Sequence, residues 1–169
     1  MKYTPVSMAI SQIGIREEGG RNRGPMVDEY LRSVGLDPTK GGEKGYAWCM
    51  AFVYWSVLGS WQRNMWEQGM SGPAQLPIDR TAWVWDLLKN KDRLCAVKPG
   101  CVFVMSHSTD PKLMPFKAHT GFVIDVHGDM AETVEGNTDG SGGREGDGVY
   151  RKHRNLSALH AFIDVERPL

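Results

Sequence analysis

One of the three cysteines, Cys49, lies where a polar loop meets an apolar segment. The loop 39–45 reads TKGGEKG, and the residues after it, AWCMAFVYW, are apolar and aromatic. This pattern predicts a helix that begins close to Cys49. Backbone N–H groups and the helix dipole stabilise an anion at such a position, so the thiol would act there as a nucleophilic thiolate. The alternative is a buried structural cysteine, because free cysteine is among the most buried residue types.

A histidine and two polar residues in the second half of the chain could complete a reactive site. His119 begins the apolar run HTGFVIDV, and the turn at 127–129 is followed by a second run that ends in Glu135, Gly136 and Asn137. Antiparallel pairing across this turn brings Glu135 or Asn137 beside His119, since neighbouring strands lie about 4.8 Å apart. Either residue could then orient the imidazole.

These residue types suit nucleophilic catalysis on an acyl carbon. Cys49 would attack as a thiolate, His119 would hold the proton and later give it to the leaving amine, and Glu135 would fix the tautomer of His119. The Cys49 backbone N–H and Asn137 could stabilise the oxyanion. Taken alone, His119 is as well explained as polar surface, and the base could instead be one of four other histidines: His107, His127, His153 or His160.

Helices are expected mainly in the first half of the chain. Thr4 followed by Pro5 has the residue types of a helix start, and Pro25 opens a second apolar periodicity. The helices predicted from apolar spacing run from Thr4 to near Glu17–Gly20, from Pro25 to Gly35, from the Cys49 region to about Gly59, and over Thr81–Asn90. Residues 60–80 are weakly periodic, so they are predicted to form a lid or a packed surface segment.

The second half of the chain reads as short strands. The predicted strands are 101–105, 119–128, 130–134, 149–153 and 158–164, separated by a loop at 106–118 and a Gly-rich loop at 137–147. Helices followed by antiparallel strands predict an α+β fold, in which the N-terminal helices pack on a C-terminal antiparallel sheet. The length of 169 residues suggests a single domain spanning 1–169.

Composition narrows the functional classes. Twenty basic and twenty acidic side chains give zero net charge, which offers no electrostatic basis for binding nucleic acid or an anionic membrane. The chain has no apolar run long enough to span a membrane and no secretory signal pattern, so we expect synthesis in the cytoplasm. An odd number of cysteines fits neither a disulfide framework nor a zinc site, and Cys95 and Cys101 are expected to be two buried thiols rather than a bridge. We expect no cofactor.

Several motifs in combination resemble the CHAP family, the cysteine- and histidine-dependent amidohydrolases/peptidases of the papain-like clan. The segments are EEGGRNRGPMVDEYLRSVGL, YAWCMAFVYW, a Pro-Gly before a strand, HTGFVIDV and VEGNT, and together they extend from about Ser7 to Phe162. The resemblance implies a papain-like fold with Cys49 as nucleophile, His119 as general base and Glu135 as third member. It implies a role for Asn137 in holding the site or the oxyanion. We assign substrate-binding roles to Trp48, Glu18 and Asn22.

The sequence departs from the family pattern at three places. Cys101 follows the Pro99-Gly100 turn where the family usually has Asp, and this should not alter the chemistry. The stretch before Cys49 lacks the acidic Asp-x-Asp pattern of relatives that bind calcium, so no metal is expected. The 106–118 segment is long, and we expect it to shape one wall of the cleft.

The resemblance implies hydrolysis of an amide bond in bacterial peptidoglycan, either between N-acetylmuramic acid and L-alanine or within the stem peptide or crossbridge. The protein would work as a monomer in the periplasm or cell wall, as a phage-type endolysin, a tail-associated lysin or an injected antibacterial effector. An effector would come with an immunity protein that plugs the cleft. The alternatives are a papain-like hydrolase or deamidase acting on a protein, and a non-enzymatic module that binds glycan or a partner.

Overall fold

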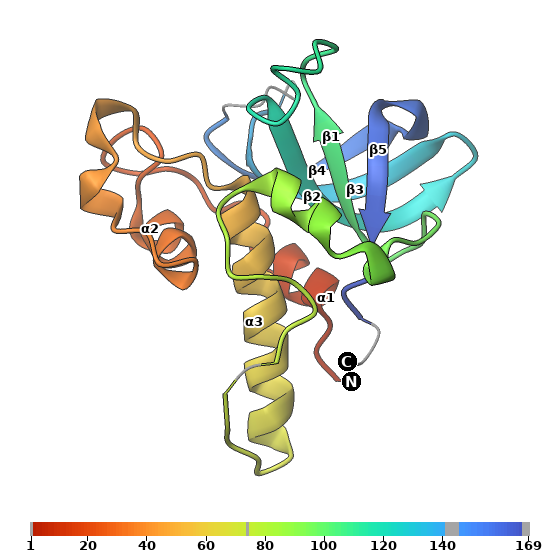
Figure 1. Ribbon diagram of the computed structural model, residues 1–169. Helices are drawn as coiled ribbons and strands as arrows, with labels where there is room; N and C mark the ends of the chain where they lie inside the picture. The colour runs from red at the N-terminus through yellow and green to blue at the C-terminus, as the bar shows by residue number, and fades with distance from the viewer. Residues whose placement is uncertain (1, 74, 141–145, 167–169) are drawn as a thin grey trace.

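The computed structural model describes residues 2–73, 75–140 and 146–166. In that part of the chain, three α-helices precede a five-stranded antiparallel sheet, which confirms the predicted α+β fold (Figure 1). The helices are α1 (Pro5–Ile10), α2 (Pro25–Ser33) and α3 (Cys49–Glu67), and the strands are β1 (Val102–Ser106), β2 (Ala118–His127), β3 (Met130–Thr138), β4 (Gly148–Asn155) and β5 (Leu159–Ile163). Short 3₁₀ turns are η1 (Pro38–Lys40), η2 (Gly42–Lys44), η3 (Val84–Lys89), η4 (Lys91–Arg93) and η5 (Leu156–Ala158).

The strand order in the sheet is β4-β3-β2-β1-β5. The hairpin predicted around residues 127–129 forms, and its register pairs Phe122 with Val134. On the other side of β2, Met105 of β1 pairs with His119. Strand β2 is therefore paired with β1 along the end that carries His119, and with β3 from Phe122 onward.

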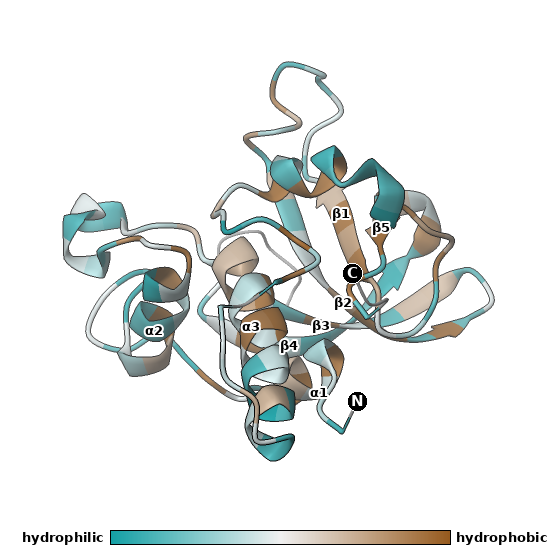
Figure 2. Ribbon diagram, turned by 60° about the horizontal axis from the view of Figure 1, so that its bottom comes forward, coloured by the Kyte–Doolittle hydropathy of each residue, from teal (hydrophilic) through white to brown (hydrophobic). Residues whose placement is uncertain are grey.

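The helices lie against the sheet in layers, with α3 between α2 and the strands (Figure 1). The apolar first half of α3 is buried against the sheet, where the rings of Phe52 and Phe122 meet at 6.5 Å. Figure 2 shows the change along this helix, from brown in the middle to teal at its far end. Burial of apolar area between α3 and the sheet fixes where the helix begins relative to β2 and β3.

The first helix is shorter than predicted. Thr4 caps it by accepting from the Ser7 N–H at 3.1 Å, as the sequence indicated, but it ends at Ile10 and not near Glu17. Gly14 takes a φ of 99°, and the Gly14 N–H then bonds the Val149 carbonyl at 3.1 Å. Residues 14–17 therefore leave the helix to pair with the start of β4, a long-range contact that local periodicity does not reveal.

The helix that carries Cys49 is longer than predicted, ending at Glu67 instead of Gly59. Asn64, inside the extension, is buried, and its amide bonds the backbone of Lys2 and Tyr3. The extension is thus held by the N-terminal segment. Beyond it, residues 68–73 are exposed, whereas Ile78 is buried and the Arg80 side chain donates to the Ser33 carbonyl at 2.8 Å. The last part of the described segment 68–80 is therefore packed on the fold.

The remaining differences from prediction are local. In place of the helix predicted over Thr81–Asn90, a 3₁₀ helix forms over Val84–Lys89, and it buries Val84 and Leu87. Strand β3 continues to Thr138, into the predicted Gly-rich loop, and residues 141–145 of that loop lie outside the described residues. The three cysteines form no disulfide bond; Cys49 and Cys101 are buried, and Cys95 is half-buried. Among the described residues, no helix has the length and apolar character needed to cross a membrane.

Candidate active site

Cys49 is the first residue of α3, as the sequence indicated. The first helical hydrogen bond runs from the Phe52 N–H to the Trp48 carbonyl at 2.9 Å. The N–H groups of Cys49 and the two residues after it therefore precede the helical ladder, at the end of the helix that favours negative charge. Cys49 is buried, with 5% of its surface exposed.

His119 and Glu135 form the pair that hairpin geometry predicted. The Nε2 atom of His119 lies 2.9 Å from a carboxylate oxygen of Glu135, and both side chains are fully buried. Gly121, two residues after His119 on β2, makes room for this contact. A Cβ there would come within 2.8 Å of the Glu135 Cγ atom, so a side chain at Gly121 would displace the carboxylate.

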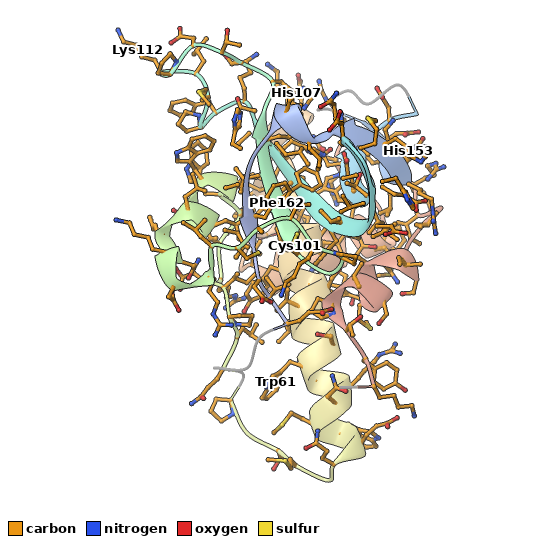
Figure 3. All side chains as sticks on the ribbon, turned by 90° about the vertical axis from the view of Figure 1, so that its right-hand side faces the viewer. Trp61, Cys101, His107, Lys112, His153 and Phe162 are labelled. Carbon is orange, nitrogen blue, oxygen red and sulfur yellow. The ribbon has the colours of Figure 1, made fainter. Side chains whose placement is uncertain are left out.

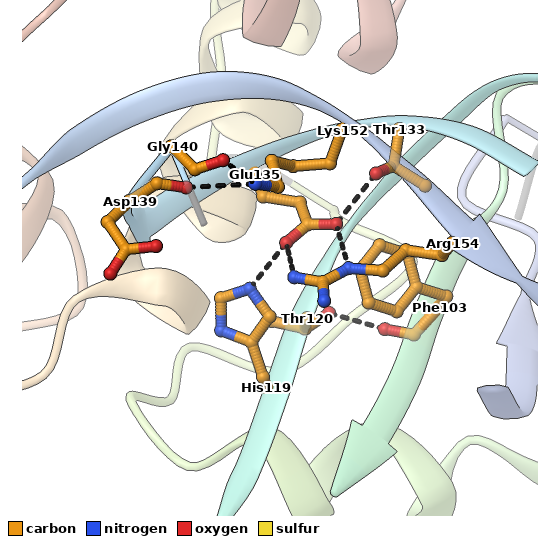
Figure 4. A network of polar contacts seen from close by, with 9 residues as sticks. All are labelled: Phe103, His119, Thr120, Thr133, Glu135, Asp139, Gly140, Lys152 and Arg154. Atoms are coloured by element: carbon orange, nitrogen blue, oxygen red, sulfur yellow. Dashed lines mark hydrogen bonds and ion pairs between the residues drawn. The ribbon is translucent and has the colours of Figure 1, made fainter. Parts of the chain in front are cut away.

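Glu135 accepts four hydrogen bonds (Figure 4). Its Oε1 atom accepts from the Thr133 hydroxyl at 2.6 Å and from the Arg154 Nε at 2.9 Å. Its Oε2 atom accepts from the Arg154 Nη2 at 2.6 Å and faces His119. Burial raises the pKa of this carboxyl, but Arg154 and His119 outweigh burial and hold the pKa of Glu135 far below its usual range. Glu135 is therefore a carboxylate at any pH of interest.

An ionised Glu135 fixes the tautomer of His119. A carboxylate can only accept, so Nε2 must carry a proton and donate it. The other ring nitrogen, Nδ1, is buried with no hydrogen-bond partner among the described residues. Burial lowers the pKa of His119, whereas the Cys49 thiol and Glu135 raise it. The net effect is a pKa raised to about 9. Nδ1 is thus the nitrogen that remains available for proton exchange with the Cys49 thiol, which is close enough to raise the pKa of His119.

Asn137 lies next to the helix that carries Cys49, where its amide joins two backbone segments. With its nitrogen turned toward acceptors, it donates to the Gly146 carbonyl at 3.3 Å and to the Asn22 Oδ1 at 3.1 Å, and it accepts from the Trp48 N–H at 3.2 Å. Asn137 and Asn22 both adopt the left-handed conformation, with φ of 58° and 54°. An oxyanion would have to displace one of these bonds, so the arrangement favours a structural role for Asn137.

The three residues assigned to substrate binding lie in different environments. Trp48 has no exposed surface, and its indole N–H donates to Glu17 at 3.0 Å. It therefore holds the start of α3, next to Cys49, from within the core. Asn22 is 8% exposed and donates to the Lys44 carbonyl at 2.7 Å, and it also contacts Asn137. Of the three, only Glu18 is exposed.

Of the four rival histidines, only His107 is near the site. Its ring centroid lies 5.9 Å from that of His119, and it is exposed at the base of the loop between β1 and β2. Figure 3 shows His107 near the sheet and Lys112 far out on the same loop. His127 is paired with Asp125 at the far end of β2, and His153 and His160 are exposed. His107 therefore faces the site from outside, while His119 occupies its buried centre.

Two aromatic side chains from separate loops meet on the surface. Trp83 and Phe116 are 41% and 60% exposed, and their rings contact edge-to-face at 5.3 Å. Phe116 lies three residues before His119, in the loop whose base holds His107. The Phe116 N–H bonds the Leu113 carbonyl at 3.0 Å, and the His107 N–H bonds the Lys117 carbonyl at 2.9 Å, so backbone hydrogen bonds hold this loop.

Three residues of the site were not found by sequence reasoning. Arg154 and Thr133 hold Glu135, and Glu17 holds Trp48. Thr133 precedes Glu135 by two residues, so strand alternation alone places both on one face. Arg154 is on β4, and only the register of a strand not adjacent in sequence to β2 could have indicated it. The described residues contain no group of three or more His, Cys, Asp or Glu side chains arranged to hold a metal ion.

A buried Cys–His–carboxylate arrangement, with the cysteine at a helix start, defines the class of thiol-dependent hydrolases of acyl compounds. The family model for the CHAP domain matches residues 41–137, more than half of the chain, and the matched span contains Cys49, His119 and Glu135. The chain belongs to the CHAP domain family of cysteine- and histidine-dependent amidohydrolases/peptidases. Neither the curated proteins nor the solved structures include a match to this chain.

Proposed function

We propose that the protein hydrolyses an amide bond of bacterial peptidoglycan, by a thiolate mechanism that uses Cys49, His119 and Glu135. The observation that carries this proposal is the orientation of His119, with Nε2 bonded to Glu135 and Nδ1 buried without a hydrogen-bond partner. A buried imidazole nitrogen beside a thiol at a helix start suits proton transfer and little else. The family supplies the amidase or peptidase class, and peptidoglycan is the substrate inferred from the resemblance.

In the proposed reaction, the thiol proton rests on His119 Nδ1 and the Cys49 sulfur attacks the carbonyl carbon. The carbonyl oxygen becomes an oxyanion, which the backbone N–H groups at the start of α3 stabilise. Collapse of this intermediate breaks the C–N bond, and the leaving amine takes the proton from His119. A thioester remains on Cys49. Water then attacks it while His119 accepts a proton, and cleavage of the C–S bond releases the acid and restores the thiol and imidazole.

The bond that is cut is either the one between N-acetylmuramic acid and L-alanine or one within the stem peptide or crossbridge. The chemistry of the site serves both, because the same thiolate attacks any amide carbon that reaches it. The exposed pair Trp83 and Phe116, next to the loop that carries His107, supports the view that residues 106–118 form one wall of the substrate cleft. Exposed apolar surface beside a reactive centre is typical of a binding site.

We further propose that the protein is made in the cytoplasm and acts in the periplasm or cell wall, after release by a phage-type lysis system or after injection as an effector. An effector would require an immunity protein in the producing cell. Expression of the protein with an added secretion signal should lyse a Gram-negative host, while cytoplasmic expression should not. Lysis by the cytoplasmic form alone would point to a target inside the cell and would contradict this localisation.

The decisive experiment is digestion of purified sacculi with the wild-type protein and with Cys49→Ala, followed by mass spectrometry of the products. New amine ends that require Cys49 would support the proposed reaction and identify the bond. A folded wild-type protein that yields no products from sacculi of Gram-negative and Gram-positive origin would contradict peptidoglycan as substrate. Incubation of a denatured protein substrate with the wild-type protein and with Cys49→Ala would then test the protein-directed alternative.

A further inference from the structure

We propose that Arg154 is a positioning residue of this site: it keeps Glu135 ionised and oriented, so that Glu135 in turn holds His119 with Nδ1 toward Cys49. The inference rests on the proposed function for its effect on turnover, but it can also be tested without turnover. Arg154 lies on β4, outside the span that the family model matches. The family match therefore assigns it no role.

The contact between Arg154 and Glu135 is bidentate and almost fully buried. The guanidinium donates from Nε to one carboxylate oxygen at 2.9 Å and from Nη2 to the other at 2.6 Å. The side chain of Glu135 is fully buried, and that of Arg154 is 13% exposed. A fork-shaped pair of this kind fixes the plane of the carboxylate as well as its position.

The register of the sheet shows that Arg154 reaches along the strands to make this contact. Its direct partner on β3 is Ala131, four residues before Glu135. Lys152, two residues before Arg154 on β4, leans the same way: it pairs with Thr133 but donates to the carbonyls of Asp139 and Gly140 (Figure 4). Two basic side chains of β4 thus converge on the catalytic end of β3.

Arg154 solves a specific electrostatic problem at this site. A carboxyl as buried as Glu135 would otherwise tend to become neutral, because burial disfavours its charge. In a neutral carboxyl, one of the two oxygens carries a proton and becomes a hydrogen-bond donor. Such a group no longer stabilises a charged imidazole beside it. His119 alone cannot supply a constant counter-charge, since it changes protonation during the reaction. The guanidinium stays charged throughout, so Glu135 can remain a carboxylate in each step.

The alternative is that the ion pair only strengthens the sheet. It predicts that loss of Arg154 lowers stability without changing how Glu135 titrates or how Cys49 reacts. A matched control is available on the same strand, because Arg151 pairs with Glu132 on β3 in a more exposed ion pair. Arg151→Gln removes a cross-strand ion pair of β3 and β4 without touching the network of Figure 4.

The experiment compares Arg154→Gln, Arg154→Lys and Arg151→Gln with the wild type, after circular dichroism has shown which are folded. Three readouts are taken: the rate of Cys49 alkylation by iodoacetamide, located by peptide mass spectrometry; the titration of Glu135 followed by ¹³C-carboxyl NMR; and sacculus hydrolysis against pH. In Arg154→Gln we expect alkylation and hydrolysis to fall roughly 10- to 100-fold at neutral pH, as displacement of a catalytic group commonly produces. The pKa of Glu135 should rise by at least about one unit.

Arg154→Lys should give smaller losses, because it keeps the charge and loses the fork, and Arg151→Gln should match the wild type. If the folded Arg154→Gln protein shows the alkylation rate and Glu135 titration of Arg151→Gln, the positioning role is wrong. If Arg154→Gln does not fold, the same comparison is made with Arg154→Lys, and wild-type alkylation in that variant overturns the inference. A wild-type protein that leaves sacculi intact would contradict the proposed function, while alkylation and NMR would still decide the role of Arg154.

Discussion

The indole N–H of Trp48 donates to the Glu17 carboxylate at 3.0 Å, which connects the residue before Cys49 to the loop that precedes α2. The second oxygen of the same carboxylate accepts from the Asn22 N–H at 2.7 Å. Trp48 also stacks on Tyr30 of α2, with ring centroids 5.6 Å apart. The start of α3 is therefore held through Trp48 from two sides, and Cys49 inherits that position.

Removal of Glu17 should loosen the start of α3. Glu17→Ala leaves the buried indole N–H and the Asn22 N–H without their acceptor, which should lower the free energy of unfolding by about 1–3 kcal/mol. It should also slow the alkylation of Cys49. The neighbouring Glu18→Ala, at an exposed position, is the control and should change stability by less than about 0.5 kcal/mol. Urea denaturation measures the stability of both variants. Equal effects of Glu17→Ala and Glu18→Ala would contradict the role of Glu17 in holding the start of α3.

The pH dependence of activity should reflect His119. Its pKa is raised from 6.5 to about 9, and the charged imidazolium is the form that donates a proton to the leaving amine. Activity should therefore decline as the pH rises through about 9. In Glu135→Gln the midpoint should move to lower pH, because Glu135 is one of the groups that raise the pKa. A rate profile that stays level to pH 10.5 would show that His119 does not act as the acid.

Stability should depend on pH through the same group. Because the folded protein raises the pKa of His119, it binds a proton more tightly than the unfolded chain does, and this contribution is complete below pH 6.5. It is lost as the pH rises through about 9, so the free energy of unfolding should decrease between these values. Glu135 contributes in the opposite sense, since its lowered pKa keeps its contribution intact until strongly acid pH. Denaturant titrations across pH 6–10 test the first of these changes.

Substitutions of Cys49, His119 and Glu135 should differ in their effects on activity and stability. Cys49→Ala should abolish hydrolysis with little loss of stability, and His119→Ala should do nearly the same to activity. Glu135→Gln should retain more activity than His119→Ala, because an amide oxygen can still accept from the imidazole. It should also destabilise the fold by roughly 3–5 kcal/mol at most, since Arg154 loses its counter-charge in a nearly buried setting. A stable, fully active Glu135→Gln protein would contradict the assigned orientation of His119.

How much of this site could be read from the sequence depends on the range of the contacts. The position of Cys49 at a helix start and the pairing of His119 with Glu135 rest on a loop composition and on one hairpin, and both are local patterns. Glu17 could not be found in this way, because it reaches Trp48 from a segment 31 residues away. Arg154 is only 19 residues from Glu135, but it pairs with Ala131 and reaches along the strands, so neither local composition nor a single hairpin indicates the contact. The same reason explains the end of α1 at Ile10, where pairing with β4 competes with helical periodicity.

The exposed aromatic pair gives the last prediction. Trp83 and Phe116 contact each other at 5.3 Å and lie on the surface, near the loop whose base places His107 next to His119. If this pair lines the substrate cleft, Trp83→Ala and Phe116→Ala should raise the KM for sacculi several-fold and leave the rate of Cys49 alkylation by iodoacetamide unchanged, because the small reagent needs no wall. Trp66→Ala is the control, since Trp66 is 84% exposed near the end of α3, far along the helix from Cys49. A Trp66→Ala protein with the same increase in KM as the other two would indicate general adhesion to the wall polymer and not a cleft at the active site.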